Sequence, residues 1–230
     1  GGELNAYTSY DQTVFYVTIS KQFSDTGLLA ISEMMGFPSF DPTEIDNERE
    51  VVIEEIKRGQ DSLGRRASQL MFSTAYQKHP YGIPVIGFEK NIREVSTQVL
   101  TDYYHSRYTP RNMFLVVVGD FQPIEMKKKI VKHFGEFVDY KFKKVKRTPE
   151  PAQKETKIAV ENAGFEQSVG YLAWKIPGLK HKDIPALDVL AAVLGQGDSS
   201  RLVRKLRSDS IVANSVGASI YAPADTGLFL

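Results

Sequence analysis

The chain has 230 residues, of which 42% are hydrophobic and 25% are charged, a composition typical of globular proteins. Its formal net charge of +1 gives no general reason to expect binding to nucleic acid or to an anionic membrane. The chain has no cysteine, which excludes disulfides and thiolate metal ligands, and no apolar run is long enough to span a membrane.

The first part of the chain is predicted to begin with two strands and to continue mainly as helices. Apolar and polar side chains alternate over residues 4–9 and 13–20, as in strands. Capping residues and helical periodicity then predict helices from Ser24 to Met35, from Pro42 to about Gln60 with Asp41 as N-cap, and over 65–77. A loop over 79–87, a helix from Ser96 to Tyr104, a strand over 113–118 and a helix over 123–134 follow.

A charged, proline-bearing stretch then predicts a domain boundary. We expect a linker over 141–155 between a first unit, 1–140, and a second unit, 156–230. Its basic part, 141–147, is most simply a solvated linker, and a nucleic-acid-binding segment is the alternative. Beyond it we expect strands near 156–162 and 167–174, helices near 182–194 and 199–207, and a last strand pair between 213 and 230. This alternation indicates two α/β units, and we expect both to be truncated.

The stretch EREVVIEEI, residues 48–56, holds four glutamates on one predicted helix. At about 100° per residue, Glu48 and Glu55 fall within the arc defined by the aliphatic residues of this helix. Glu50 and Glu54 point the other way. Carboxylates are rarely buried unless they are paired, hydrogen-bonded or bound to a metal. Glu48 and Glu55 are therefore the candidate functional pair.

Other motifs for metal or nucleophilic chemistry are absent from the sequence. The four histidines, at positions 79, 105, 133 and 181, lack the i, i+4 spacing that places two imidazoles on one helical face. No serine-nucleophile, phosphate-loop or dinucleotide glycine pattern occurs. The residues alone leave two alternatives for Glu48 and Glu55: a metal site, or neutralisation by Arg65, Arg66 or backbone amides.

Five segments together resemble one enzyme family. They are GGELNAYTSYDQTVFY (1–16), FDPTEIDNEREVVIEEI (40–56), HPYGIPVIG (79–87), YTPRNMFLVVVGDF (108–121) and DIPALDVLAAVLGQGDSSRLVRKLR (183–207). In this order they resemble the inverzincin zinc metallopeptidases of the pitrilysin, insulin-degrading enzyme and mitochondrial processing peptidase type, especially the shorter bacterial members. The resemblance implies an α+β fold of two related α/β sandwich units, each with a mixed, largely antiparallel sheet and helices packed on one face.

The resemblance also assigns roles to the two glutamates. In this family two histidines of an H-x-x-E-H helix and a later glutamate hold zinc. The E-x6-E pattern of the family matches here, so Glu55 is implied as the third zinc ligand and Glu48 as a supporting carboxylate. The family spacing would place H-x-x-E-H upstream of Gly1. We therefore expect zinc in the intact protein, none bound to this fragment, and no activity of the fragment alone.

Residues for substrate binding follow from the same resemblance. Residues 4–9 correspond to the strand along which these enzymes bind an extended peptide, with Asn5 and Ala6 nearest the scissile bond. For Asn5, a simple turn residue is the alternative. Arg207 matches a catalytic arginine of the family, whereas Asn214 stands where a tyrosine is expected. Missing donors would come from a homologous second half or partner subunit that forms a clamshell.

The sequence thus predicts part of a zinc endopeptidase that cleaves extended peptides, bound by strand addition, in a closed chamber. The alternative is a non-catalytic family member that serves as an assembly or substrate-binding subunit. Composition predicts neither a nucleic-acid nor a membrane partner. The compartment stays open, with a lean towards the cytoplasm or periplasm of a bacterium.

Overall fold

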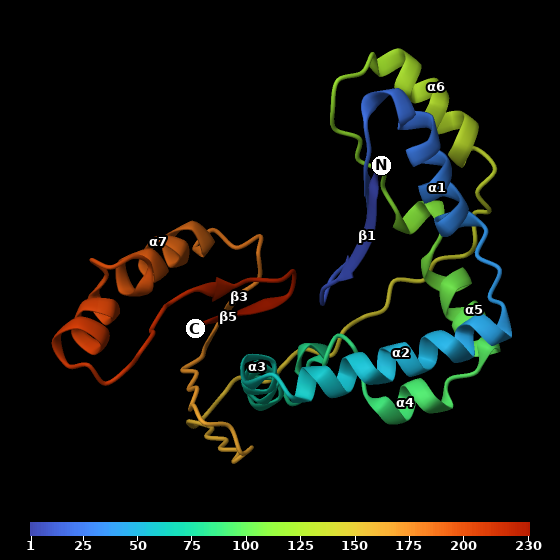
Figure 1. Ribbon diagram of the computed structural model, residues 1–230. Helices are drawn as coiled ribbons and strands as arrows, with labels where there is room; N and C mark the ends of the chain where they lie inside the picture. The colour runs from blue at the N-terminus through green and yellow to red at the C-terminus, as the bar shows by residue number, and fades with distance from the viewer. The chain divides into compact units, whose positions relative to one another are not determined.

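The chain forms an α+β structure, as predicted, and the computed structural model describes residues 1–230 (Figure 1). Its residues group into two units, one formed by 1–58 with 85–147 and the other by 59–84 with 148–230. The chain passes from the first unit to the second for the last time between Arg147 and Thr148, inside the stretch 141–155. Residues 59–84 differ from our expectation, because we placed them in the first unit and they group with the second.

The first unit begins with an antiparallel hairpin and continues with helices. Its elements are β1 (Glu3–Thr8), β2 (Thr13–Thr18), η1 (Lys21–Phe23), α1 (Ser24–Gly36), most of α2 (Pro42–Gln60), α4 (Glu89–Glu94), α5 (Thr97–Arg107), η3 (Pro110–Asn112) and α6 (Pro123–Phe134). The predicted elements of this unit are confirmed except for the strand over 113–118, and α4 was not predicted. No helix of the chain combines the length and the apolar character needed to cross a bilayer.

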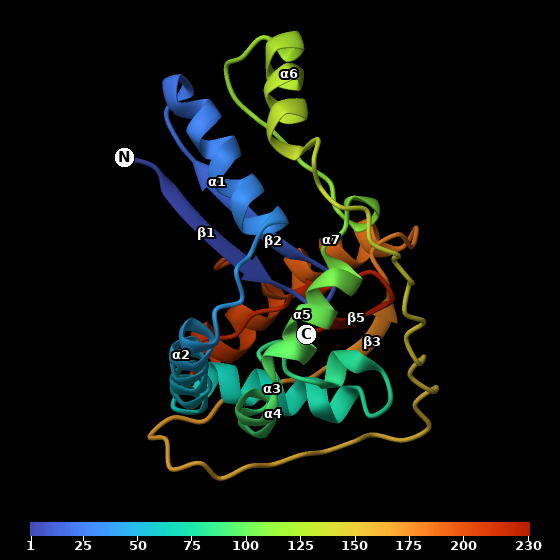
Figure 2. The ribbon, with the colours of Figure 1, turned by 90° about the vertical axis from the view of Figure 1, so that its right-hand side faces the viewer.

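Helix α1 lies close to β2 because a glycine faces the strand. A Cβ atom on Gly27 would lie 3.1 Å from Cγ2 of Ile19 and 3.2 Å from Cγ1 of Val17, which is tighter than ordinary contact. Helix α1 also packs beside α6, as Figure 2 shows, where Nζ of Lys129 donates to the hydroxyl of Ser24 at 3.0 Å. The hairpin, α1 and α6 therefore pack against one another in sequence, with α1 between β2 and α6.

The start of α2 follows directly from its sequence. One carboxylate oxygen of Asp41 accepts the backbone N–H groups of Thr43 at 2.8 Å and Glu44 at 3.2 Å. Pro42 occupies the first helical position, where no N–H is needed. The predicted N-cap is therefore confirmed, and it fixes where the glutamate helix begins.

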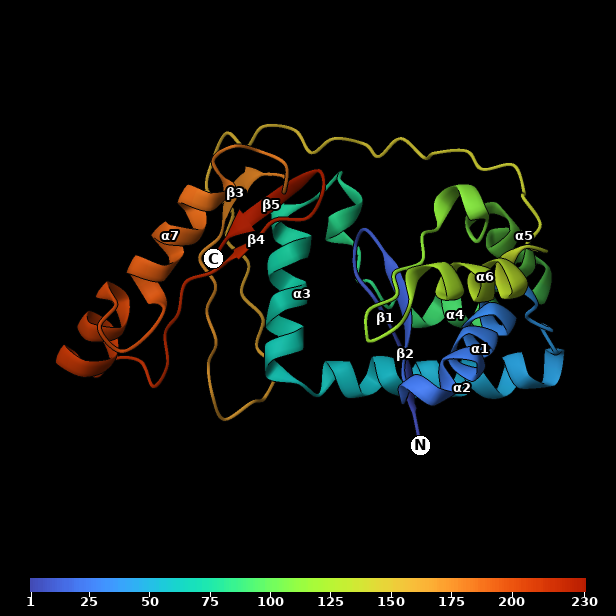
Figure 3. The same ribbon diagram turned by 90° about the horizontal axis from the view of Figure 1, so that it is seen from above.

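The second unit has a small antiparallel sheet covered by a helix. Its elements are α3 (Leu63–Ala75), η2 (Pro80–Gly82), β3 (Trp174–Pro177), α7 (Ile184–Gly195), η4 (Val203–Asp209), β4 (Ile220–Tyr221) and β5 (Thr226–Phe229). The strand order is β3-β5-β4, and Figure 3 shows α7 beside this sheet. The core between them contains Ile176, Ile184, Ala191, Ala218 and Phe229.

Three stretches that we predicted as strands are not paired strands. They are 113–118, 156–162 and most of 167–174. Residues 114–118 make no backbone hydrogen bond, and Phe114 and Val118 are 86% and 91% exposed. A strand is stabilised by the ladder it forms with a neighbour, and no segment of residues 1–230 pairs with these stretches. The apolar residues of these stretches therefore predicted strands but did not identify a pairing partner.

A buried carboxylate holds the loop at residues 77–84 in the second unit. One oxygen of Glu150 accepts the N–H groups of Lys78 at 2.8 Å and His79 at 3.0 Å, and Nζ of Lys175 lies 3.4 Å from the other oxygen. Burial alone would raise the pKa of Glu150. The N–H groups of His79, Lys78 and Gln77, with the charge of Lys175, instead lower this pKa to about 2.

The same loop explains the role of His79, one of the four histidines that lack metal-binding spacing. Its side chain is buried. Nδ1 accepts the N–H of Tyr81 at 3.2 Å, and Nε2 lies 3.3 Å from a carboxylate oxygen of Asp225. Because Nδ1 is an acceptor, the hydrogen of the neutral ring sits on Nε2 and faces Asp225. His79 is therefore a packing residue.

The helix predicted over 199–207 takes a different form. Residues Val203–Asp209 form the π-helical segment η4, and the N–H of Ser210 bonds to the carbonyl of Lys205 at 3.2 Å. Ile211 then has a φ of 51°, which is in the left-handed region. A β-branched residue is strained there, because its Cβ atom approaches the following carbonyl oxygen. The chain leaves η4 through an unfavourable backbone conformation.

Replacing Ile211 with glycine should therefore stabilise the protein. Ile211 is 81% exposed, so little packing is lost, and glycine adopts the left-handed region without strain. We expect the free energy of unfolding to rise by ~0.5–1 kcal/mol. Urea unfolding followed by circular dichroism measures this change. Val212→Gly is the control: Val212 is also exposed but has no left-handed φ, so this variant should be destabilised.

Glu150→Gln should produce a pH-dependent loss of stability. The pKa of Glu150 is about 2 in the folded chain, against 4.5 ordinarily, so its stabilisation is fully present above about pH 4.5 and is lost as the pH falls towards 2. At neutral pH the free energy of unfolding of the variant should be ~1–3 kcal/mol lower than that of the natural chain. Near pH 2 the urea midpoints of the variant and of the natural chain should converge. A constant difference across this range would contradict the assignment, and Glu166→Gln, an exposed carboxylate of the same unit, is the control.

Candidate functional site

The two candidate glutamates lie on one exposed stripe of α2. Glu48, Val51 and Glu55 follow the i, i+3, i+7 spacing, and all three are exposed, Val51 by 58%. The buried side chains of this helix are Ile53 and Ile56. Ile53 moves the centre of the buried arc away from the glutamates, so the expectation that they share the aliphatic face is corrected. Their stripe borders the buried one.

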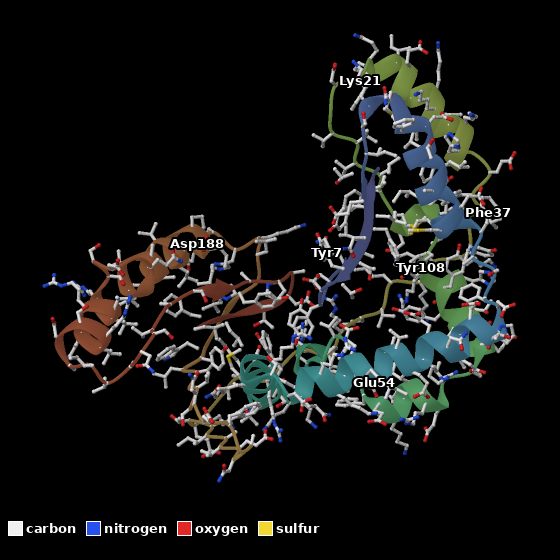
Figure 4. The ribbon with its side chains drawn as sticks, viewed as in Figure 1. Tyr7, Lys21, Phe37, Glu54, Tyr108 and Asp188 are labelled. Atoms are coloured by element: carbon white, nitrogen blue, oxygen red, sulfur yellow. The ribbon has the colours of Figure 1, made fainter.

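The neighbouring glutamates are distinguished by their partners. Glu50 lies 3.4 Å from the guanidinium of Arg93, and Glu54 lies 2.6 Å from Nζ of Lys57 (Figure 4 labels Glu54). The charge and hydrogen bond of Lys57 lower the pKa of Glu54. Glu48 and Glu55 form no ion pair or hydrogen bond in this structure. The division into two pairs that the helical period predicted is therefore visible in their contacts.

An arginine on the buried stripe of α2 was missed in the sequence. The side chain of Arg49 is only 16% exposed. Its Nη1 donates to the carbonyl of Ile92, and its Nη2 donates to the carbonyl of Val95 at 2.9 Å. Both carbonyls lie at the C-terminal end of α4, which runs beside α2 (Figure 1). Its position on the helical wheel, in the middle of the aliphatic arc, was the one signal that could have identified Arg49.

The predicted substrate residues lie on an open strand edge. Asn5 pairs with Tyr16 and Ala6 pairs with Phe15 in the hairpin. Strand β1 has no other neighbour, so its second edge is free, and all its residues are exposed. The side-chain oxygen of Asn5 accepts the N–H of Ala6 at 2.8 Å. Because Asn5 lies inside β1, the alternative of a simple turn residue is wrong.

Arg207, the predicted catalytic arginine, lies in the π-helical segment η4 of the second unit. Its guanidinium is 3.3 Å from the carboxylate of Asp198, and both side chains are exposed. Asn214 is also exposed. π-Helical turns occur often at functional sites, and this one sets the direction of Arg207.

The donor set fits one part of a zinc site. Residues 1–230 bring together no group of three histidine or acidic side chains that could hold a metal ion. Glu55 nevertheless offers an exposed carboxylate that no cation neutralises, and carboxylate oxygen is a normal zinc ligand. Glu48 lies on the same stripe, where it could support such a ligand.

Two family models together match nearly the whole chain. Residues 1–89 match the model described as insulinase, peptidase family M16. Residues 94–230 match the model described as the peptidase M16 inactive domain. The two matches meet near the start of α4, so they do not coincide with the two spatial units.

Individual relatives agree with these matches. A zinc protease, PqqE, from Helicobacter pylori is 31% identical over 100% of this chain and 53% of that protein. The uncharacterized zinc protease YmxG from Bacillus subtilis is 29% identical over 99% of this chain and 55% of that protein. The crystal structure of a protease from Helicobacter pylori has a TM-score of 0.86, at 31% identity, and covers 100% of this chain and 57% of that chain.

The chain therefore spans about half the length of the curated relatives it matches. The structural likeness extends over both units, and the sequence matches include the glutamate helix and the open strand. A match to a family model over more than half of the residues places the chain in a family whose named relatives are zinc proteases. The chain belongs to peptidase family M16.

Proposed function

We propose that this chain is part of a zinc-dependent endopeptidase in which Glu55 is a zinc ligand and Glu48 is a supporting carboxylate. The observation that carries the proposal is the exposed stripe of α2, on which these two carboxylates have no partner while Glu50 and Glu54 form ion pairs. The names of the relatives support zinc as the metal. The other ligands would come from polypeptide outside residues 1–230.

The chain's own residues have simple roles in this proposal. When bound, zinc with an open coordination position lowers the pKa of a water molecule and polarises a peptide carbonyl. Glu55 would contribute one oxygen to that ion from the second half of the long, capped helix α2. Glu48 lies seven residues earlier, on the same stripe of the helix. It would accept hydrogen bonds from neighbouring zinc ligands and so keep them oriented.

Substrate binding is assigned to the free edge of β1. An extended peptide can pair with such an edge through backbone hydrogen bonds, which recognise the main chain rather than one side chain. Asn5 and Ala6 would lie beside the reacting peptide bond. Arg207 is proposed as a catalytic arginine that acts on a substrate carbonyl in the complete protein. A homologous second half or partner subunit would close the chamber, in keeping with relatives about twice as long as this chain.

Replacing Glu55 with glutamine in the complete protein should abolish zinc retention and peptide cleavage together. Glutamine keeps the size of the side chain but removes the charge that binds the ion. Zinc affinity should fall by more than the roughly 10–100-fold typical of an outer-shell substitution. Metal content after dialysis and cleavage of an unfolded peptide measure the two effects.

The matched control for this test is Glu54→Gln on the same helix. Glu54 is exposed and pairs with Lys57, so this variant should keep both zinc and activity. Normal zinc and normal cleavage in Glu55→Gln would refute the assignment. A natural protein that binds no zinc and cleaves no peptide would favour the alternative function, a non-catalytic assembly or substrate-binding subunit.

A separate prediction concerns Glu48. If it supports the ligands rather than binding the ion, Glu48→Gln should weaken zinc by ~10–100-fold without abolishing it. Competition with a chelator of known affinity measures this difference. Glu50→Gln, two residues further along the helix and paired with Arg93, should leave the affinity unchanged.

A further inference from the structure

The N-terminal half of α2 has few apolar anchors. Its buried side chains, Ile53 and Ile56, both lie in the second half of the helix. Val51 is exposed, and Glu48 faces solvent. Apolar packing therefore fixes the rotation of the helix near Glu55 more firmly than near Glu48.

Arg49 supplies the missing anchor in the first half. It lies on the same stripe as Ile53 and Ile56, at i, i+4 and i+7. Its guanidinium donates to the carbonyls of Ile92 and Val95. Neither carbonyl accepts a backbone N–H, so Arg49 satisfies two groups at the end of α4 that would otherwise lack a partner. Two donors from one planar group resist rotation of the helix better than a single bond does.

We infer that Arg49 is a positioning residue, whose bonds to the Ile92 and Val95 carbonyls fix the rotation of α2 and so the direction of Glu48. This inference rests on the proposed zinc site. Residues 48 and 49 are consecutive and therefore point about 100° apart around the helix. Any roll that moves Arg49 from the two carbonyls also moves Glu48. Functional groups generally need to be held within roughly 0.5 Å and 10–20°.

An ion pair between the two helices provides the matched control. Arg93 of α4 lies 2.8 Å from Glu89 and 3.4 Å from Glu50, and these side chains are substantially exposed. An exposed pair of this kind contributes little to position or stability. Arg93→Lys should therefore leave the rotation of α2 unchanged, whereas Arg49→Lys, which retains the charge but not the two-pronged geometry, should not.

The first test measures zinc affinity in the complete protein by chelator competition. Arg49→Lys should weaken zinc by ~10–100-fold, as an outer-shell change does. Combined with Glu48→Gln, it should add little further loss, because both substitutions remove the same support. Unchanged affinity, or losses that simply multiply in the double variant, would overturn the inference. If Arg49→Lys does not fold, Arg49→Gln, which retains an N–H donor, gives the same comparison.

The second test needs no zinc and separates this inference from the proposed function. The chain has no cysteine, so a spin label can be attached at Glu48→Cys and another at Tyr7→Cys on β1 of the same unit (Tyr7 is labelled in Figure 4). Arg49→Lys should shift or broaden the distance distribution, and Arg93→Lys should not. If Glu55→Gln keeps zinc but the distances respond, the zinc assignment alone fails. If the distances do not respond, the positioning role fails.

Discussion

Helix α2 packs against the protein with one stripe of side chains and presents another stripe to solvent. Because both stripes lie on the same helix, each keeps its direction only while the rotation of the helix is fixed. Ile53 and Ile56 bury one stripe, and the neighbouring stripe carries Glu48 and Glu55 into solvent. The N-cap at Asp41 fixes where the helix begins, and Arg49 ties its first half to α4. The exposed carboxylates keep a constant direction because the buried stripe beside them is anchored at both ends.

In the second unit, a carboxylate rather than a guanidinium holds two distant segments together. The carboxylate of Glu150 accepts backbone N–H groups of the loop around His79, and the ammonium group of Lys175 lies beside it and neutralises its charge. In both units a charged group of one segment satisfies backbone groups of a segment far away in the sequence. Such contacts are costly to break because a buried polar group is left without a partner.

Local patterns were sufficient for most of the fold, and the helical period separated Glu48 and Glu55 from the ion-paired Glu50 and Glu54. The hairpin, the N-cap at Asp41 and the helix over 123–134 each depend on neighbours within a few residues, and each was predicted. The prediction of strands over 113–118 and 156–162 was wrong, because a strand needs a pairing partner and the local sequence pattern does not identify one. The role of Arg49 was missed for the same reason, since its carbonyl partners are 43 and 46 residues away.

The physical reason for selecting Glu48 and Glu55 also changes with the structure. On the helical wheel they stood out as charges on an apolar face, where a missing partner would be costly. In the structure both are exposed, so water solvates them and their lack of a partner costs little. An exposed charge becomes buried only when something covers it. In the proposed function, a cation and a further segment of protein would cover both carboxylates together, and metal binding would offset the cost of burying them.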